Sequence, residues 1–161
     1  MPSELIHAYR LYFPLLVRKC ARMLGDGHEA EDVAQEAFLR LHDAGIALDD
    51  PRRVTAWLYR TSTRLAVDRL RSRARLVSED HAFDSLSSQA SPERQALFAG
   101  MWAELVRRLP EDELSAALLS HVDGLKQQEI AEVLGIHERS VRRLLVRFEE
   151  RAVRLRTRSE R

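Results

Sequence analysis

The sequence contains few of the residues that build disulfides, strands or membrane spans. Of its 161 residues only one is cysteine, six are glycine and five are proline, and aromatic residues make up 6%. Cys20 cannot form a disulfide within the chain, and its place in a helical stretch predicts a small buried side chain. No apolar run approaches the about 20 residues that cross a bilayer, and the N-terminus lacks the pattern of a secretory signal. We therefore expect a cytoplasmic protein without membrane insertion.

Catalytic and metal-binding motifs are missing as well. The six histidines have no HExxH spacing, and neither a GxxxxGK[ST] phosphate loop nor a GxSxG nucleophile elbow occurs. The sequence predicts a protein that is not an enzyme and that uses no cofactor or metal.

The abundant residues are Leu, Ala, Arg and Glu, which cost little in a helix, whereas alternating runs of Val, Ile and Thr are absent. This composition predicts an all-α fold of two small helical domains, at 1–75 and 93–156, with a tail at 157–161. Residues 76–92 contain five serines and no sustained periodicity, which predicts a flexible linker. Helices are expected over about 4–23 (with a kink or break near Pro14), 28–45, 51–75, 93–109, 110–123, 126–134 and 138–155.

Basic residues gather in two blocks. Residues 52–75 contain eight arginines and one acid, and residues 139–161 contain nine arginines and three acids, while the rest of the chain is acidic overall. One such block is as well explained by a solvated helix face. Two blocks in an otherwise acidic chain favour binding to the phosphate backbone of nucleic acid at two places.

The second block overlaps a pattern typical of a helix-turn-helix, QQEIAEVLGIHERSVRRLLV, starting at Gln127. A small residue, Ala131, falls where the helices cross, and Gly135 falls at the turn, where positive φ favours glycine. Apolar residues at helical spacing are predicted to bury the two helices against each other, and Ile136 to plug the turn: Ile130, Leu134, Val141 and Leu144.

The outward face of the second helix is polar. A recognition helix contacts base edges from its N-terminal residues and phosphates from the flanking ones. Arg139 and Arg143 suit guanine, whereas Ser140, Arg142 and Arg147 suit phosphate equally well. Glu138 could accept a hydrogen bond from cytosine or simply favour the helix N-terminus.

With these elements placed, nearly the whole chain resembles the extracytoplasmic-function (ECF) group of bacterial sigma-70-type sigma factors. The segment LGDGHEAEDVAQEAFLRLH resembles the polymerase-binding helix of that family, and AWLYRTSTRLAVDRLRSRAR its −10 element helix. LPEDELSAALLSHVDGLKQQEIAEVLGIHERSVRRLL resembles its −35-binding domain. The resemblance implies a region 2-like and a region 4-like domain, and an alternative sigma factor that recognises promoter DNA and opens its −10 element.

The resemblance also implies partners. Core RNA polymerase would bind through its β′ clamp helices and β flap, and an anti-sigma factor is a further partner that the family admits. Asp32, Gln35, Glu36 and Phe38 lie where the family contacts the clamp helices, although the acids also suit a helix N-terminus and Phe38 also suits the core.

The remaining carried-over residues concern the −10 element. The loop from about Asp43 to Thr55 matches the loop that receives a flipped base, yet it has no aromatic ring to stack on that base. Leu48 is the apolar residue best placed as a wall of that site. Arginines of the loop end and the long helix are expected at the DNA backbone: Arg52, Arg53, Arg60, Arg69, Arg71 and Arg73.

One position departs from the family. Seven residues after Trp57, where many members have asparagine, this chain has Arg64, which favours guanine or phosphate and puts the usual −10 preference in doubt. Trp57 itself lies on the apolar stripe and is expected in the core. Two other functions stay open: a dimeric helix-turn-helix regulator that acts without polymerase, and a sigma mimic that binds only a regulatory protein.

Overall fold

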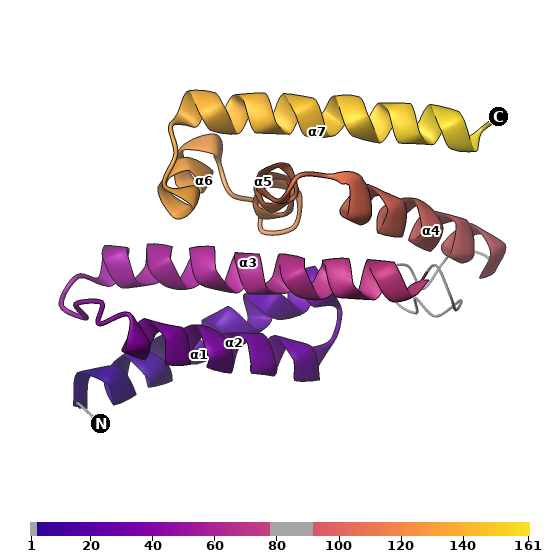
Figure 1. The fold of residues 1–161 in the computed structure, drawn as a ribbon. Helices are drawn as coiled ribbons and strands as arrows, with labels where there is room; N and C mark the ends of the chain where they lie inside the picture. The colour runs from indigo at the N-terminus through magenta and orange to yellow at the C-terminus, as the bar shows by residue number, and fades with distance from the viewer. Residues whose placement is uncertain (1–2, 78–91) are drawn as a thin grey trace.

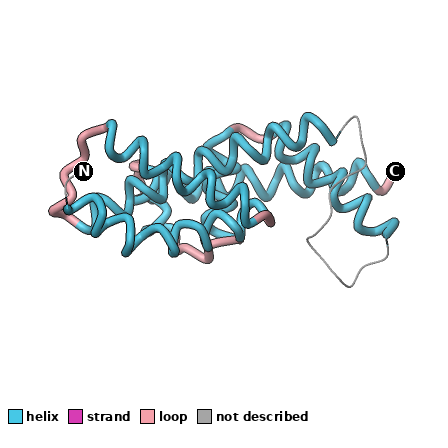
Figure 2. The backbone as a smooth tube through the Cα atoms, turned by 90° about the horizontal axis from the view of Figure 1, so that it is seen from below, coloured by secondary structure: helices cyan, strands magenta, loops and turns pink. Residues whose placement is uncertain are grey.

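A computed structural model describes residues 3–77 and 92–161, and in this part of the chain every regular element is a helix (Figure 2). The all-α prediction is confirmed. The N-terminal domain comprises α1 (Ser3–Leu24), α2 (Gly27–Asp43) and α3 (Pro51–Val77), and the C-terminal domain comprises α4 (Pro92–Arg108), α5 (Glu111–His121), α6 (Gln127–Leu134) and α7 (Glu138–Ser159). Most of the predicted linker, residues 78–91, lies outside the described residues. None of the described helices is long and apolar enough to cross a membrane.

Two of the helices begin directly after an aspartate that caps them. Asp26 precedes α2 and accepts hydrogen bonds from the backbone N–H groups of His28, at 2.8 Å, and Glu29, at 3.1 Å. Asp50 does the same for Arg52 at the start of α3, directly before Pro51. These caps satisfy N–H groups that have no partner inside the helix, so both predicted starts are confirmed to within a residue.

A kink or break was predicted near Pro14, and the break is wrong. The proline lies inside α1, which is continuous from Ser3 to Leu24. Pro14 is exposed, while Leu16 and Cys20 in the following turns are buried. Packing of those side chains against the other helices holds the C-terminal half of α1 in place. The helical hydrogen bond that Pro14 cannot donate is lost on the exposed side of the helix.

The N-terminal domain is built around α3, against which α1 and α2 pack. Its core contains the residues that the helical spacing predicted, including Val33, Phe38 and Leu41 from α2 and Val54 and Leu58 from α3. Cys20 is fully buried, as expected, and burial raises the pKa of its thiol to about 11. Trp57 packs against this core and is half-buried.

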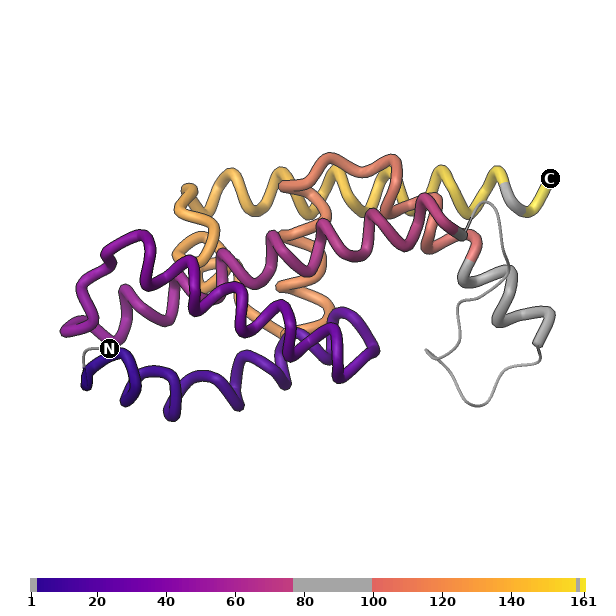
Figure 3. Tube along the Cα trace, turned by 60° about the horizontal axis from the view of Figure 1, so that its bottom comes forward, coloured from indigo at the N-terminus to yellow at the C-terminus, as the bar shows by residue number. Residues whose placement is uncertain are grey.

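The C-terminal domain packs directly on the N-terminal one. In Figure 1, α4, α5 and α6 lie along α3, with α7 on their far side. Figure 3 shows from another direction that the C-terminal domain lies on the α3 side of the N-terminal domain. The described helices thus form a closed arrangement in which one face of α3 is covered.

Candidate nucleic-acid interface

The helix-turn-helix has the predicted geometry. Gly135 ends α6 with φ 68°, and its N–H donates to the carbonyl of Ala131 at 2.9 Å. Of the four side chains predicted to bury the two helices, Ile130 and Val141 are fully buried, whereas Leu134 and Leu144 are only half-buried. Ile136 does not fully plug the turn, because 36% of it stays exposed. The turn is instead closed mainly by the left-handed glycine and by Val141, which leaves the first residues of α7 accessible.

The outward face of α7 carries the predicted DNA-contacting residues. Arg139, Arg142, Arg143 and Arg147 are all exposed, Glu138 is exposed at the first turn, and Ser140 is half-buried. Within the described residues, these four arginines form no side-chain hydrogen bond or ion pair, in contrast to Arg151 further along α7, which pairs with the buried Glu113 at 3.0 Å. The four arginines therefore form one exposed cationic surface that can bind phosphate or base edges.

The seven arginines of α3 that were predicted to contact DNA divide into two groups. Arg52, Arg53 and Arg64 are exposed, and the closest partner of Arg52 is the exposed Glu132 at 4.0 Å. The half-buried group contains Arg60, Arg69, Arg71 and Arg73. Three members of the second group contact other parts of the protein, so the basic block that the sequence grouped together is split by the fold.

Two of these contacts cross the domain boundary. Arg60 donates from Nε to the carbonyl of Val133 in α6, and Arg71 donates from Nη2 to the carbonyl of Leu109, both at 2.6 Å. Arg60 also lies against the turn: a Cβ on Gly135 would be 2.7 Å from its Nη2. In the closed arrangement, two arginines that were predicted to hold DNA are therefore hydrogen-bonded to the C-terminal domain instead.

Arg73 has a different environment. Its Nη1 donates to the carbonyl of Leu24 at 2.6 Å, and its guanidinium pairs with Glu29 at the start of α2. These contacts tie α3 to the turn between α1 and α2 inside the N-terminal domain. A phosphate contact of Arg73 stays a prediction and would compete with both.

A buried ion pair joins the two domains. Lys19 of α1 lies 3.1 Å from Asp123, which follows α5, and the two side chains are 0% and 1% exposed. Lys19 also donates to the hydroxyl of Thr63 on α3 at 2.9 Å. Arg22 reaches the same carboxylate from the outside, at 3.3 Å. Burial lowers the pKa of Lys19 below its ordinary value, and the negative charge of Asp123 opposes that shift.

The sequence prediction missed this pair, although one signal was present. Lys19 lies at helical spacing from Leu16 and Met23, both buried on the same stripe of α1. A lysine on an apolar stripe needs an opposite charge because an isolated buried ammonium is very unfavourable. Asp123 stood out only as part of a helix-stop sequence, so its partner could not be identified without the fold.

Two of the four predicted polymerase-binding residues line an apolar groove, and Asp32 and Glu36 do not. Gln35 and Phe38 of α2 line it together with Ile6 and Tyr9 of α1 and Leu39, and its volume is about 500 Å³. Ile6 and Leu39 are 42% and 64% exposed, which is unusual for large apolar side chains. Phe38 is 5% exposed and packs edge-on to Tyr9, with ring centroids 5.1 Å apart. Ile6, Tyr9 and Leu39 were missed by the sequence prediction.

The two predicted acidic residues have different environments. Asp32 is exposed, whereas Glu36 is half-buried and pairs with Arg40 one turn later, at 2.7 Å. Leu48, in the loop before α3, is half-buried and packs against the core of the N-terminal domain. Its role as the wall of a base-binding site stays a prediction.

An all-α chain with a helix-turn-helix and an arginine-covered recognition helix belongs to the class of DNA-binding proteins. Comparison with known families narrows this class. The family Sigma-70 region 2 matches residues 8–76, and the family Sigma-70, region 4 matches residues 100–150.

Several curated proteins are similar along most of the chain. The ECF RNA polymerase sigma factor SigW of Bacillus subtilis is 31% identical over 78% of this chain and 74% of its own length. The RNA polymerase sigma-H factor of Pseudomonas aeruginosa is 32% identical over 80% of this chain and 74% of its own. The ECF RNA polymerase sigma factor SigE of Mycolicibacterium smegmatis is 32% identical over 88% of this chain, which spans only 57% of that longer protein. The chain belongs to the sigma-70 family, in its extracytoplasmic-function group.

Proposed function

We propose that this chain is an alternative sigma factor that directs core RNA polymerase to a specific set of promoters. The observation that carries the proposal is the occurrence, in one chain, of two separate arginine surfaces on the region 2 and region 4 domains, beside an apolar groove that suits a protein partner. A repressor that acts without polymerase would need only the helix-turn-helix. A sigma mimic would need neither arginine surface.

In this proposal the domains divide the work. Arg139 and Arg143 on α7 contact base edges of the −35 element in the major groove, and Arg142 and Arg147 hold its phosphates. The exposed arginines of α3, including Arg64, hold the −10 element while its strands separate. The groove between α1 and α2 binds the β′ clamp helices. The polymerase performs all catalysis, so the protein needs no catalytic residue of its own. Its place of action is the cytoplasm, where the polymerase is.

Promoter binding requires the two domains to separate. The −10 and −35 elements are centred about 25 base pairs apart, which is about 85 Å of duplex at 3.4 Å per base pair. In the closed arrangement, by contrast, Gly135, in the turn before the recognition helix, lies against Arg60 of α3. Both elements cannot be contacted at once by surfaces this close together, so binding to polymerase and promoter must replace the contacts between the domains.

Reconstitution with core polymerase tests the proposal. The purified chain is mixed with core enzyme and genomic DNA, and the 5′ ends of the transcripts are sequenced. We expect initiation at a set of sites that share −35 and −10 sequences and that core enzyme alone does not use. A chain that neither binds core polymerase nor starts transcripts at specific sites would refute the proposal.

A pair of variants tests the division of work. Arg143→Ala should weaken binding to promoter DNA but leave binding to core polymerase unchanged, whereas Leu39→Glu should weaken binding to core polymerase. Arg107→Ala, which removes an exposed arginine outside both surfaces, is the matched control. Equal loss of both activities in Arg143→Ala would contradict the assigned roles.

A further inference from the structure

The polar contacts between the two domains share one polarity. In each interdomain contact described above, the N-terminal domain supplies the cation and the C-terminal domain supplies the acceptor. The acceptors are two carboxylates, of Asp123 and Glu132, and two backbone carbonyls, of Leu109 and Val133. The cations that contact them are, in chain order, Lys19, Arg22, Arg52, Arg60 and Arg71.

The two carbonyls lie at the C-terminal ends of helices. Val133 is in the last turn of α6, and Leu109 directly follows α4. Carbonyl groups at this end of a helix have no partner inside the helix, and they carry the negative end of the helix dipole, which is equivalent to about half an elementary charge. Arg60 and Arg71 are therefore bonded to oxygens of partial negative charge, as they would be in a phosphate contact.

The segment that supplies all four acceptors is acidic. Residues 109–134 contain six acidic residues and one lysine, whereas residues 52–75 contain eight arginines and one acidic residue. These two segments lie side by side, because α5 and α6 pack along α3 (Figure 1). In the closed arrangement an acidic part of the chain thus covers a basic helix.

The arginines on the covered side of α3 form a row. Arg60 and Arg71 are eleven residues apart, which is about three turns and about 16 Å at 1.5 Å per residue, so they lie on one face of the helix. Arg64, one turn after Arg60, is exposed and lies close to this face. A chain of phosphates can contact such a row at successive groups, because its charges repeat along a line.

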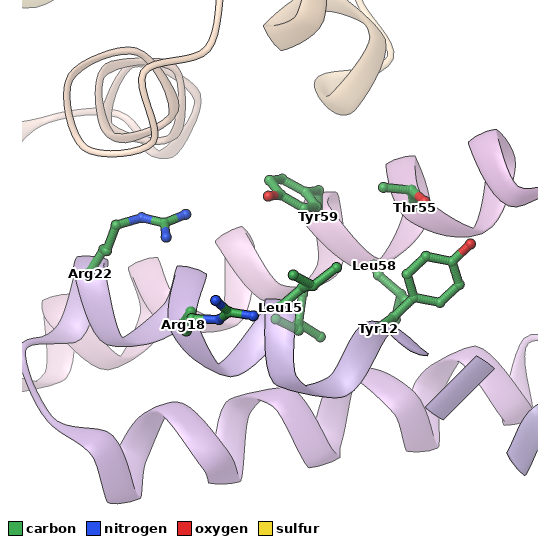
Figure 4. Close-up of a pocket in the computed structure, with 8 residues that line it drawn as sticks. Tyr12, Leu15, Arg18, Arg22, Thr55, Leu58 and Tyr59 are labelled. Carbon is green, nitrogen blue, oxygen red and sulfur yellow. The ribbon is translucent and has the colours of Figure 1, made fainter. Parts of the chain in front are cut away.

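Arg22 extends the row onto α1. It lies at the edge of a cavity of about 260 Å³ between α1 and α3, which Tyr12 and Tyr59 also line (Figure 4). A hydrogen bond joins Arg22 to Tyr59, which precedes Arg60 on α3. The guanidinium donates from Nε and Nη2 to one oxygen of Asp123, at 3.4 Å and 3.3 Å, although 48% of the side chain is exposed. Arg22 was not predicted to contact DNA, and its position makes it part of the same anion-binding surface.

From these contacts we propose that residues 109–134 act as an internal substitute for a phosphate chain, and that a free phosphate chain opens the closed arrangement by replacing them. Such a chain binds Arg22, Arg52, Arg60 and Arg71 in the open form. The proposal rests on the proposed function for the role of α3 at the promoter, but opening itself needs neither bases nor polymerase. The ligand chemistry is a linear series of phosphates, which inorganic polyphosphate and a nucleic-acid backbone share.

Energy transfer in the full chain tests the proposal. Dyes are attached to cysteines at the exposed positions Asp49 and His137, one on each domain, and inorganic polyphosphate is added at constant ionic strength. We expect transfer to fall to a plateau with polyphosphate and to stay unchanged with orthophosphate at the same total phosphate. Oligothymidylate should open the chain as well, because it contains the same series of phosphates.

A second measurement uses the link between opening and affinity. Asp123→Asn leaves the buried Lys19 without its counter-charge and so favours the open form. A ligand that binds only the open form has an apparent affinity reduced by the small open fraction. Asp123→Asn should therefore bind polyphosphate about tenfold or more tightly than the wild-type chain.

Further variants identify the surface that binds. The exposed arginines of α7 form a second cationic surface, so Arg139, Arg142, Arg143 and Arg147 are changed together to glutamine. This variant should lose binding to the −35 element but should still open with polyphosphate.

Single arginines of the proposed surface are changed one at a time. Arg52→Gln alters closure little, because the side chain is 88% exposed and its pair with Glu132 is 4.0 Å long. Arg52→Gln and Arg22→Gln should each weaken polyphosphate binding and reduce the slope of log affinity against log salt by about one. Arg107→Gln, outside this surface, should change neither. Circular dichroism establishes that each variant is folded, and if one variant is not, the other decides.

Four results would overturn the proposal. They are an unchanged transfer at saturating polyphosphate, an equal fall with orthophosphate, opening by oligothymidylate alone, and loss of opening in the α7 variant while Arg22→Gln and Arg52→Gln behave as wild type. Any of these, together with promoter-specific transcription by the wild-type chain, would reject opening by a phosphate chain and leave the sigma factor function intact. Absence of core polymerase binding would reject the function, whereas polyphosphate would still open the chain.

Discussion

Replacing Asp123 with asparagine should open the closed arrangement. The change keeps the shape of the side chain but leaves Lys19, which is 0% exposed, without its counter-charge. Removing one partner of a buried ion pair costs about 3–5 kcal/mol because the other charge stays desolvated. Here the chain can avoid that cost by separating its domains, which hydrates the lysine. Since 1.4 kcal/mol is a factor of ten, we expect the closed-to-open ratio to fall by about 10²- to 4 × 10³-fold.

Energy transfer between two dyes reports this opening. Asp49 and His137 are exposed, at the start of α3 and directly before α7, and each can be replaced by cysteine for labelling. Cys20 does not interfere, because it is buried and its thiol pKa is raised to about 11. Transfer should be high in the otherwise wild-type chain and should fall in Asp123→Asn. Small-angle scattering should show the matching increase in radius of gyration.

Two further variants control the experiment. Glu104→Gln removes an exposed pair with Arg108 on α4, which is worth less than about 1 kcal/mol, and should leave the transfer unchanged. The double variant Lys19→Met/Asp123→Asn buries no unpaired charge and should regain much of the closed population. Unchanged transfer in Asp123→Asn, with or without a lower Tm, would refute the view that this pair holds the domains together.

Four other predictions follow from single groups. Because burial in the closed state lowers the pKa of Lys19 below 10.5, the closed state binds fewer protons than the open state at pH values between the two pKa values. Closing should therefore become more favourable as the pH rises through this range. Energy transfer measured against pH tests this, and Lys19→Met should abolish the pH dependence. Cys20 should react with a thiol reagent at neutral pH only as fast as the domain unfolds, and a rate equal to that of a free thiol would contradict its burial. Gly135→Ala should lower the Tm, by a strain of about 1 kcal/mol or more at φ 68°, and should also favour the open state because its Cβ meets Arg60. Arg143→Ala should reduce the slope of log affinity for promoter duplex against log salt by about one if the residue holds a phosphate, and should instead relax sequence preference if it binds a base.

Features with local causes were predictable from the sequence. The caps at Asp26 and Asp50 depend on side chains two or three residues from the N–H groups that they accept from, so the sequence places them without knowledge of the fold. The turn of the helix-turn-helix depends in the same way on Gly135 and on the spacing of Ile130 and Val141. Pro14 shows the limit of this approach, since tertiary packing of the following turns overrides its local preference.

Features that join distant segments were not predictable. Arg60 and Arg71 were grouped with the other arginines of the basic block, yet they donate to carbonyls of the C-terminal domain. The composition of a helix face indicates that it is polar but does not indicate what covers it. The same holds for the cavity between α1 and α3, because Tyr12 and Tyr59 are brought together only by the crossing of the two helices.

The pairing of Lys19 with Asp123 has a consequence for protein engineering. Sigma factors of this kind invite exchange of the C-terminal domain to change the −35 sequence that they recognise. In this chain such an exchange would also replace the residue that neutralises a lysine buried in the other domain. A chimera whose new domain lacks an acid at the position of Asp123 should therefore have a different balance between closed and open forms, even where its DNA-contacting residues are unchanged. If the acid at the position of Asp123 is retained when the recognition helix is exchanged, promoter choice can be changed without changing domain closure.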